Sequence, residues 1–246
     1  MIRQILIGLR SYTDSFGIIS RLQLWKYFVI PILISLATAL LIGFSAYAWS
    51  DNITDYVTSL FPGWEPPAWL RTIEIFFFGA LIILMGLILY KHIIMALSAP
   101  FMSPVSEKIE AHYYGQLHAE HRNTKFSEQL WRGIRINTRN LLKELLLSIP
   151  VLLLGLIPVV GVVSASLLFL IQAYYAGFGN MDYTLERHFN YKESVKFVGS
   201  RKGLAIGNGI VFMLLLLIPI LGVILVLPLS VVSATKITLE EINQQP

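Results

Sequence analysis

The chain has no cysteine among its 246 residues, so disulfides, thiolate metal sites and cysteine nucleophiles are excluded. Charged residues are also scarce, at 14%, whereas a soluble domain has about 25%. Strand-length segments of alternating polarity, the mark of a membrane-spanning β-barrel, are missing. The sequence is 55% hydrophobic with a mean hydropathy of +0.66, which predicts an all-α integral membrane protein.

Signatures of catalysis and cofactor binding are missing as well. The sequence contains no serine nucleophile elbow, acidic metal motif or phosphate-binding loop, so we expect neither an enzyme nor a cofactor. The alternative hypothesis of a membrane-embedded enzyme that acts on lipids is supported only by one cluster of possible metal ligands: His112, His118, Glu120 and His121. Its spacing matches no strong zinc motif, and we interpret it as a polar loop without metal.

Two stretches, residues 145–181 and 204–235, carry no charge at all. One membrane crossing takes about 20 apolar residues, so each stretch is too long for one crossing and short for two. Each is interrupted near its middle by a similar motif, Leu-Ile-Pro-Val-Val-Gly in one and Leu-Ile-Pro-Ile-Leu-Gly in the other. Since proline and glycine interrupt helices, we predict two helical hairpins that partly penetrate the bilayer. The expected turn residues are Pro158, Gly161, Pro219 and Gly222.

The remaining segments supply two full spans and their polar flanks, within one membrane domain over 1–246. Residues 25–49 and 75–97 are each long and apolar enough to cross the membrane. Residues 1–24 predict an amphipathic helix that lies either in the membrane interface or against the protein's own helices. Residues 103–144 predict a polar, helical cytoplasmic segment. Lys91 and His92 are expected at the cytoplasmic end of the second span.

Lysine and arginine are distributed unevenly between the loops. Residues 50–74 contain one of them, Arg71, whereas residues 103–144 contain seven and residues 182–203 contain five. The positive-inside rule therefore places everything except the 50–74 loop in the cytoplasm, including both termini. This basic cytoplasmic face accounts for the net charge of +4 without any binding of nucleic acid.

Charged residues near the predicted spans are candidates for an anion site or a gate. Lys26, with Arg21 before it, lies at a helix start, where unpaired N–H groups and the helix dipole favour anions. The alternative for Lys26 is simple anchoring at the lipid interface. Glu107 and Glu110 follow a proline-containing break and either gate a vestibule or belong to a solvated helix face.

Polar residues inside and beside the predicted hairpins form a second group of candidates. Gln172 and Asn208 interrupt the two hairpins with amides, which in lipid usually bond to a neighbouring helix; a role in a pathway is the alternative. Asp182 follows the first hairpin, where we expect a salt bridge to a cation such as Arg201.

Four motifs occur in order along nearly the whole chain. They are Leu24-Trp25-Lys26-Tyr27-Phe28-Val29-Ile30-Pro31; Ser98-Ala99-Pro100-Phe101 with Glu107 and Glu110; Ile157-Pro158-Val159-Val160-Gly161 with Gln172, Tyr175, Met181-Asp182-Tyr183 and His188-Phe189; and Arg201-Lys202 with Ile218-Pro219. This ordered set resembles the CysZ-type sulfate permease family, part of the wider etoposide-induced membrane-protein family.

The resemblance implies two long transmembrane helices and two partly penetrating hairpins, assembled as a homo-oligomer among membrane lipids. It also implies that sulfate passes across a bacterial inner membrane and supplies cysteine synthesis. The sulfate-transporting members carry a glycine–apolar–arginine–arginine motif at the start of the first span. Here the matching residues are Gln23, Leu24, Trp25 and Lys26, so one cation remains. A lone lysine is a point charge without the bidentate fork of arginine, and this keeps a non-transporting membrane scaffold open as the alternative.

Overall fold

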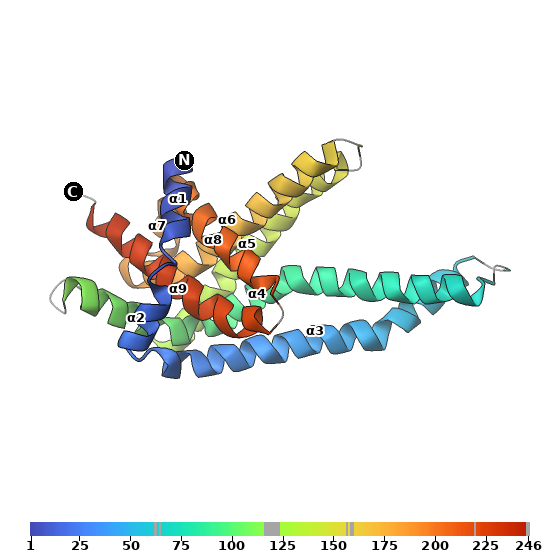
Figure 1. The fold of residues 1–246 in the computed structure, drawn as a ribbon, viewed down its shortest axis with the longest axis horizontal. Coiled ribbons are helices and arrows are strands. Elements are labelled where there is room, and N and C mark those ends of the chain that lie inside the picture. Colours follow the sequence, from blue (N-terminus) through green and yellow to red (C-terminus); the bar gives the residue numbers. More distant parts are fainter. Residues whose placement is uncertain are drawn as a thin grey trace.

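All regular structure in the part of the chain that the structure describes is helical. The computed structural model describes residues 1–61, 63, 65–115, 124–155, 157, 160–218 and 220–244, with only the backbone at 221. Figure 1 shows two long arms that project from a body of shorter helices. The first arm is formed by α3 (Trp25–Ser59) and α4 (Ala68–Tyr114), and the second by α5 (Phe126–Leu154) and α6 (Val160–His188).

Both helices of the first arm are longer than a bilayer crossing requires. With 35 and 47 residues, α3 and α4 extend about 50 Å and about 70 Å, whereas the hydrocarbon core is about 30 Å thick. The predicted spans 25–49 and 75–97 are therefore parts of longer helices. Four helices in the described residues are long and apolar enough to cross a membrane: α3, α4, α6 and residues Gly222–Asn243 of α9.

The surface of the first arm is apolar, which in water would be unfavourable. Exposed fractions of 60–81% are found for large apolar side chains along both helices; examples are Leu40, Phe44, Phe76 and Leu84. A soluble monomer rarely exposes a contiguous apolar surface of this kind, whereas lipid chains can cover it. The exposed surface thus agrees with the class of membrane protein that the composition predicts.

The two predicted hairpins are present as helix pairs, with bounds wider than 145–181 and 204–235. The second pair consists of α8 (Lys202–Leu216) and α9 (Leu221–Asn243). Pro158 and Pro219, two of the expected turn residues, lie outside the described residues.

The other two expected turn residues, Gly161 and Gly222, lie in the first turns of α6 and α9 instead of in the connections. A Cβ on Gly222 would lie 2.6 Å from the Leu215 carbonyl oxygen, so this glycine lets α9 approach α8 closely. Ile220, just before α9, has the positive φ of 66° in that connection.

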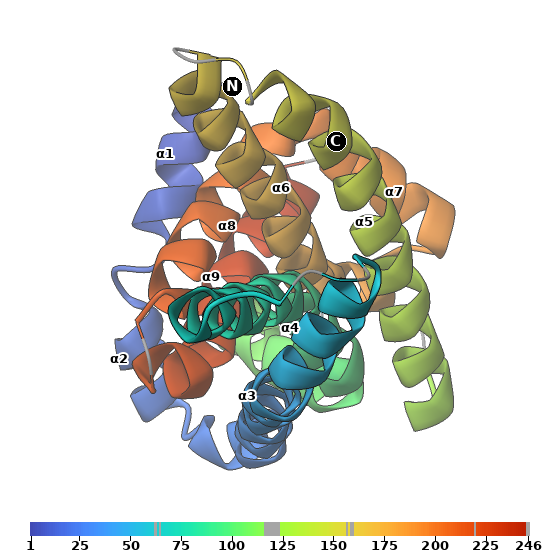
Figure 2. The same ribbon diagram turned by 90° about the vertical axis from the view of Figure 1, so that its right-hand side faces the viewer.

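The N-terminal segment 1–24 is not one helix, as its periodicity predicts, but two. α1 (Ile2–Arg10) and α2 (Ser15–Arg21) are separated by a turn. α1 packs on α8, where a Cβ on Gly8 would lie 2.7 Å from the Leu204 carbonyl oxygen. The sequence leaves open whether this segment lies in the membrane interface or against the protein's own helices, and α1 lies against the protein's own helices. Figure 2 shows α1, α8 and α9 on one side of the body.

The polar segment 103–144 is not one unit either, because it divides between the last turns of α4 and the first half of α5. A short helix, α7 (Tyr191–Ser200), follows α6. The Asn190 side chain accepts from the backbone N–H groups of Lys192 and Glu193, and the Glu193 carboxylate accepts from the Asn190 N–H. This capping box explains why the chain starts a new helix here.

The C-terminal half of α6 forms the centre of the body. Every residue from Tyr175 to Arg187 is buried, although Asn180, Asp182 and Arg187 are polar. Buried polar groups are costly unless they are hydrogen-bonded or paired. The partners of these residues therefore define the polar interior.

Candidate functional site

A buried ion pair joins the first arm to α5. The Lys91 Nζ atom of α4 lies 2.6 Å from Glu144 Oε1, and the His92 Nε2 atom lies 3.0 Å from Glu144 Oε2. The Lys91 and Glu144 side chains are 0% and 2% exposed. The sequence places Lys91 and His92 at the cytoplasmic end of the second span, and the structure adds that both side chains are buried there, because α5 covers that part of α4. Ionisable residues within membrane helices commonly face the protein interior and mark functional sites.

A second buried cluster joins α4 to the end of α6. The Arg187 Nη2 atom lies 2.6 Å from Glu110 Oε2, and the His188 Nε2 atom lies 3.3 Å from the same oxygen. Arg187 Nε donates to Ser106 Oγ at 2.9 Å. Glu110, a predicted gating residue, is therefore fixed between two basic side chains, whereas its neighbour Glu107 is exposed.

A third ion pair joins α5 to α6. Arg132 binds Asp182 with two hydrogen bonds of 2.9 and 3.1 Å and also donates to the Phe189 carbonyl oxygen. Burial alone lowers the pKa of Arg132, but the Asp182 carboxylate outweighs it and the pKa is raised. The expected salt bridge of Asp182 is confirmed, but its partner is Arg132; Arg201, the cation suggested from the sequence, lies 2.6 Å from Glu241 of α9.

A neutral network surrounds Asn208 of α8. Its Oδ1 accepts from Asn180 at 2.9 Å, and its Nδ2 donates to Ser233 Oγ at 3.1 Å. The Tyr12 hydroxyl donates to the Asn208 carbonyl oxygen at 2.8 Å, and burial raises the pKa of Tyr12 so that the phenol keeps its proton. Asn208 thus bonds to neighbouring helices, as amides in lipid usually do. Gln172, the other predicted amide, is half-buried on α6.

The start of α3 carries an exposed pair of cations. The Lys26 Nζ atom lies 5.3 Å from the centroid of the Tyr27 ring, and the Lys108 Nζ atom of α4 lies 5.5 Å from the same centroid. Arg21, the other predicted anion ligand, ends α2 and is exposed on a different helix from Lys26. The structure therefore places a second lysine, Lys108 of α4, beside the same tyrosine ring as Lys26, which the sequence position of Lys26 does not reveal.

The possible metal cluster falls largely outside the structure. His112 lies in the last turn of α4, while His118, Glu120 and His121 are outside the described residues. Within the described ranges, no group of three His, Cys, Asp or Glu side chains is placed to hold a metal ion.

Sequence reasoning missed the buried partners on α5, although a signal for them exists. Asn137, Asn140 and Glu144 recur at three- and four-residue steps, so they lie on one face of α5, and all three are buried. Polar side chains usually mark the solvated face of an amphipathic helix. The pattern itself is therefore visible, but only the packing shows that this face points inward.

Spanning helices and a polar interior closed by ion pairs define a multi-pass, all-α membrane protein. Residues 11–227, most of the chain, match the family described as Sulfate transporter CysZ/Etoposide-induced protein 2.4, and the chain belongs to this family. The resemblance drawn from the four motifs is thereby confirmed. A comparison with curated proteins gave no match.

Proposed function

We propose that this protein passes sulfate or a related oxyanion across the bacterial inner membrane, through a site that starts at Lys26 and Lys108. The family supports the substrate class, and the observation that supports the site is the pair of ammonium groups beside Tyr27. In this proposal the protein works as a homo-oligomer with both termini in the cytoplasm, as the family resemblance and the distribution of Lys and Arg predict.

The local structure suits a doubly charged anion. Lys26 lies in the first turn of α3, whose N-terminal N–H groups have no side-chain cap. The helix dipole adds positive potential at this point. Lysine ammonium groups are strongly hydrated point charges and bind oxyanions less rigidly than an arginine fork does. Conduction requires binding that is weak enough for release, and such a site meets this requirement.

A scaffold without transport is the second candidate, and Trp25 is the observation that favours it. At a position where sulfate-transporting members carry arginine, Trp25 packs against the core, with its ring 6.5 Å from that of Phe28. A cation has thus been replaced by a packing residue. On this alternative, Lys26 and Lys108 anchor the helix ends and bind no substrate.

The test is uptake of radiolabelled sulfate into proteoliposomes of the purified protein, compared with empty vesicles. The variants Lys26→Glu and Lys108→Glu each replace an attraction by a repulsion, and we expect uptake to fall roughly tenfold in each. Lys192→Glu changes an exposed lysine on α7 and serves as the matched control, with uptake close to that of the unchanged protein.

Two results would overturn the proposal. The first is uptake no greater than that of empty vesicles from protein that elutes as a folded, single species. The second is sulfate uptake that is the same in all three charge-reversal variants. Loss of a copurifying protein from Lys26→Glu, without any change in flux, is the result that the scaffold candidate predicts.

A further inference from the structure

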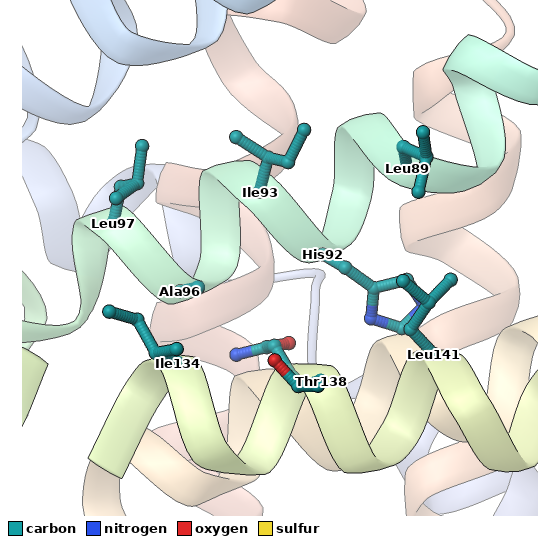
Figure 3. Close-up of a pocket in the computed structure, with 9 residues that line it drawn as sticks. Leu89, His92, Ile93, Ala96, Leu97, Ile134, Thr138 and Leu141 are labelled. Carbon is teal, nitrogen blue, oxygen red and sulfur yellow. The ribbon is translucent and has the colours of Figure 1, made fainter. Parts of the chain in front are cut away.

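Three basic residues form a row along one side of α5. Arg135, Arg139 and Lys143 are each four residues apart, so they lie on the same face of the helix. Figure 3 shows that Ile134 and Thr138 point from α5 toward α4. Arg135 and Arg139 each follow one of these residues by one position, which turns them about 100° further around the helix. The basic row therefore lies on a different side of α5 from its contact with α4.

No carboxylate within the described ranges forms an ion pair with a member of this row. The Arg139 guanidinium lies 5.1 Å from the centroid of the Phe178 ring and donates one hydrogen bond, to Asn140 Oδ1 at 2.8 Å. An arginine has five N–H donors, so most of those of Arg139 can still reach a ligand. Arg135 and Lys143 are both exposed. The row is thus a set of cations without a counter-charge in the part of the chain that the structure describes.

The nearest acidic residues along α5 do not neutralise the Arg139–Lys143 end of the row. Glu144 follows Lys143 in the sequence, but it is buried and already paired with Lys91. Glu128 lies on the same face as the row, but at the start of α5, where its carboxylate accepts a backbone N–H. An anion at Arg139 and Lys143 therefore meets attraction from the row.

The face that carries the row becomes apolar in the second half of α5. Leu142, Leu146, Ile149 and Leu153 recur at three- and four-residue steps and are 55–69% exposed. Leu146 lies two helical turns after Arg139 on the same face. In Figure 2, where α3 and α4 are viewed nearly end-on, α5 lies along the outer edge of the molecule. Lipid chains can cover this apolar strip, which belongs to the hairpin that the sequence predicts to enter the bilayer.

We propose that Arg139 and Lys143, with Arg135 beside them, bind the phosphate of an anionic phospholipid whose chains lie along the apolar strip of α5. Basic clusters that directly precede a membrane-inserted segment attract anionic lipids, and a guanidinium can bind a phosphate through two parallel hydrogen bonds. A free oxyanion would use the cations but leave the strip uncovered, whereas a phospholipid uses both. This site lies on a different helix from Lys26 and Lys108 and does not depend on sulfate passage.

The test is native mass spectrometry of the full-length protein in detergent, with added phosphatidylglycerol or with phosphatidylcholine that has the same chains. We expect phosphatidylglycerol to bind at least tenfold more tightly. The double variant Arg139→Gln with Lys143→Gln should lower its affinity at least tenfold and leave phosphatidylcholine unaffected. Arg139→Lys with Lys143→Arg keeps both charges and should bind within threefold of the unchanged protein.

Two further variants separate the site from general effects of charge and folding. Arg10→Gln with Lys202→Gln also removes one exposed arginine and one exposed lysine, but on α1 and α8, and affinity should stay within twofold. Lys143→Gln alone changes an exposed side chain that forms no ion pair with a described residue, so the fold should be kept while affinity falls about threefold.

A phosphatidylglycerol with a photoreactive diazirine in its chain locates the bound lipid in vesicles. After irradiation, peptide mass spectrometry should find label at Leu146 and Ile149. The double glutamine variant should reduce this labelling at least fivefold, while labelling of Phe76, an exposed residue on the first arm, should persist.

Equal affinities for the two lipids would overturn the proposal and leave a plain apolar contact. Displacement of phosphatidylglycerol by an equal concentration of glycerol phosphate would overturn it in favour of a free oxyanion site. An equal loss of affinity in the Arg10 and Lys202 control, or none in Lys143→Gln, would also overturn it. Sulfate uptake that depends on Lys26 and Lys108 is a separate readout, so either proposal can fail without the other.

Discussion

At the scale of single residues, Lys91 is a buried charge that depends on a single partner for its stabilisation. A lysine side chain with no exposed surface keeps its charge only beside a counter-charge, and Glu144 supplies it at 2.6 Å. A buried pair of this kind adds little net stability compared with an apolar pair of the same size. Removing one partner is far more harmful, because the other charge stays buried alone.

Glu144→Gln should therefore lower the free energy of unfolding by ~3–5 kcal/mol, because Lys91 loses its carboxylate. The double variant Lys91→Met with Glu144→Leu should recover most of that loss, since no buried charge remains. Equilibrium unfolding in mixed micelles measures both. Glu107→Gln, at an exposed glutamate of α4, is the control and should change the value by less than ~0.5 kcal/mol. A single variant as stable as the unchanged protein would contradict the buried pair.

Gln23 is a second residue whose conformation carries a cost. Its φ is 51°, in the left-handed region, at the junction of α2 and α3. Sulfate-transporting relatives typically have glycine at the matching position, where this conformation is free of strain. A side chain with a Cβ is disfavoured there by ~1–2 kcal/mol, partly offset by the greater entropy that glycine loses on folding.

Gln23→Gly should consequently raise the free energy of unfolding by up to ~1 kcal/mol relative to Gln23→Ala, because both variants lose the same side chain and only glycine relieves the backbone. The same unfolding assay measures the difference. A Gly variant less stable than the Ala variant would show that the left-handed conformation is not retained in the folded protein.

At the scale of helices, the crossing of α6 and α8 depends on direct backbone contact. A Cβ on Gly177 would lie 1.8 Å from the Ala205 carbonyl oxygen, and a Cβ on Gly209 would lie 1.7 Å from the Ala173 carbonyl oxygen. Two alanine–glycine pairs four residues apart thus meet face to face. Small residues of this kind let membrane helices approach closely.

Gly177→Ala should force α6 and α8 apart and lower the free energy of unfolding by at least ~3 kcal/mol, or prevent folding altogether. Gly43→Ala is the matched control, because Gly43 is also inside a long helix but a Cβ there has open space around it. The free energy of unfolding of this control should be unchanged or rise by up to ~1 kcal/mol, because alanine favours the helix more than glycine does. Monodispersity after extraction and thermal unfolding of the two variants would separate these outcomes; equal behaviour would argue against the close crossing.

At the scale of the whole molecule, the lack of cysteine makes orientation directly measurable. The proposed topology places the far end of the first arm outside the cytoplasm and places α7 in the cytoplasm. Ser59 at the end of α3 and Lys192 on α7 are both exposed. Each can be replaced by a single cysteine in a chain that has none of its own.

In intact spheroplasts, a membrane-impermeant maleimide should label Ser59→Cys at once and Lys192→Cys only after permeabilisation. The physical reason is that the basic segment around Lys192 stays inside while the 50–74 loop, with its single cation, is translocated. The cysteine-free chain is the control for background labelling. Immediate labelling of both variants would contradict a single orientation with returning hairpins.

The sequence by itself determined the membrane class, the helical content and the presence of four long apolar segments. Hydropathy and helix propensity depend on neighbouring residues, so they can be evaluated without tertiary contacts. Segment length, the proline and glycine interruptions and the distribution of lysine and arginine predicted two spans and two hairpins, and the family motifs implied the same arrangement. The division of residues 1–24 into two helices was missed, because amphipathic periodicity continues across the turn between them.

The tertiary structure alone decided which polar residues meet. Three buried ion pairs join residues that are 50 or more positions apart in the sequence: Lys91 with Glu144, Arg132 with Asp182, and Arg187 with Glu110. Lys26 and Lys108, also far apart in the sequence, both lie beside the Tyr27 ring. A charged side chain looks alike in the sequence whether it faces water or a counter-charge, and the packing of α4, α5 and α6 determines which of the two it meets.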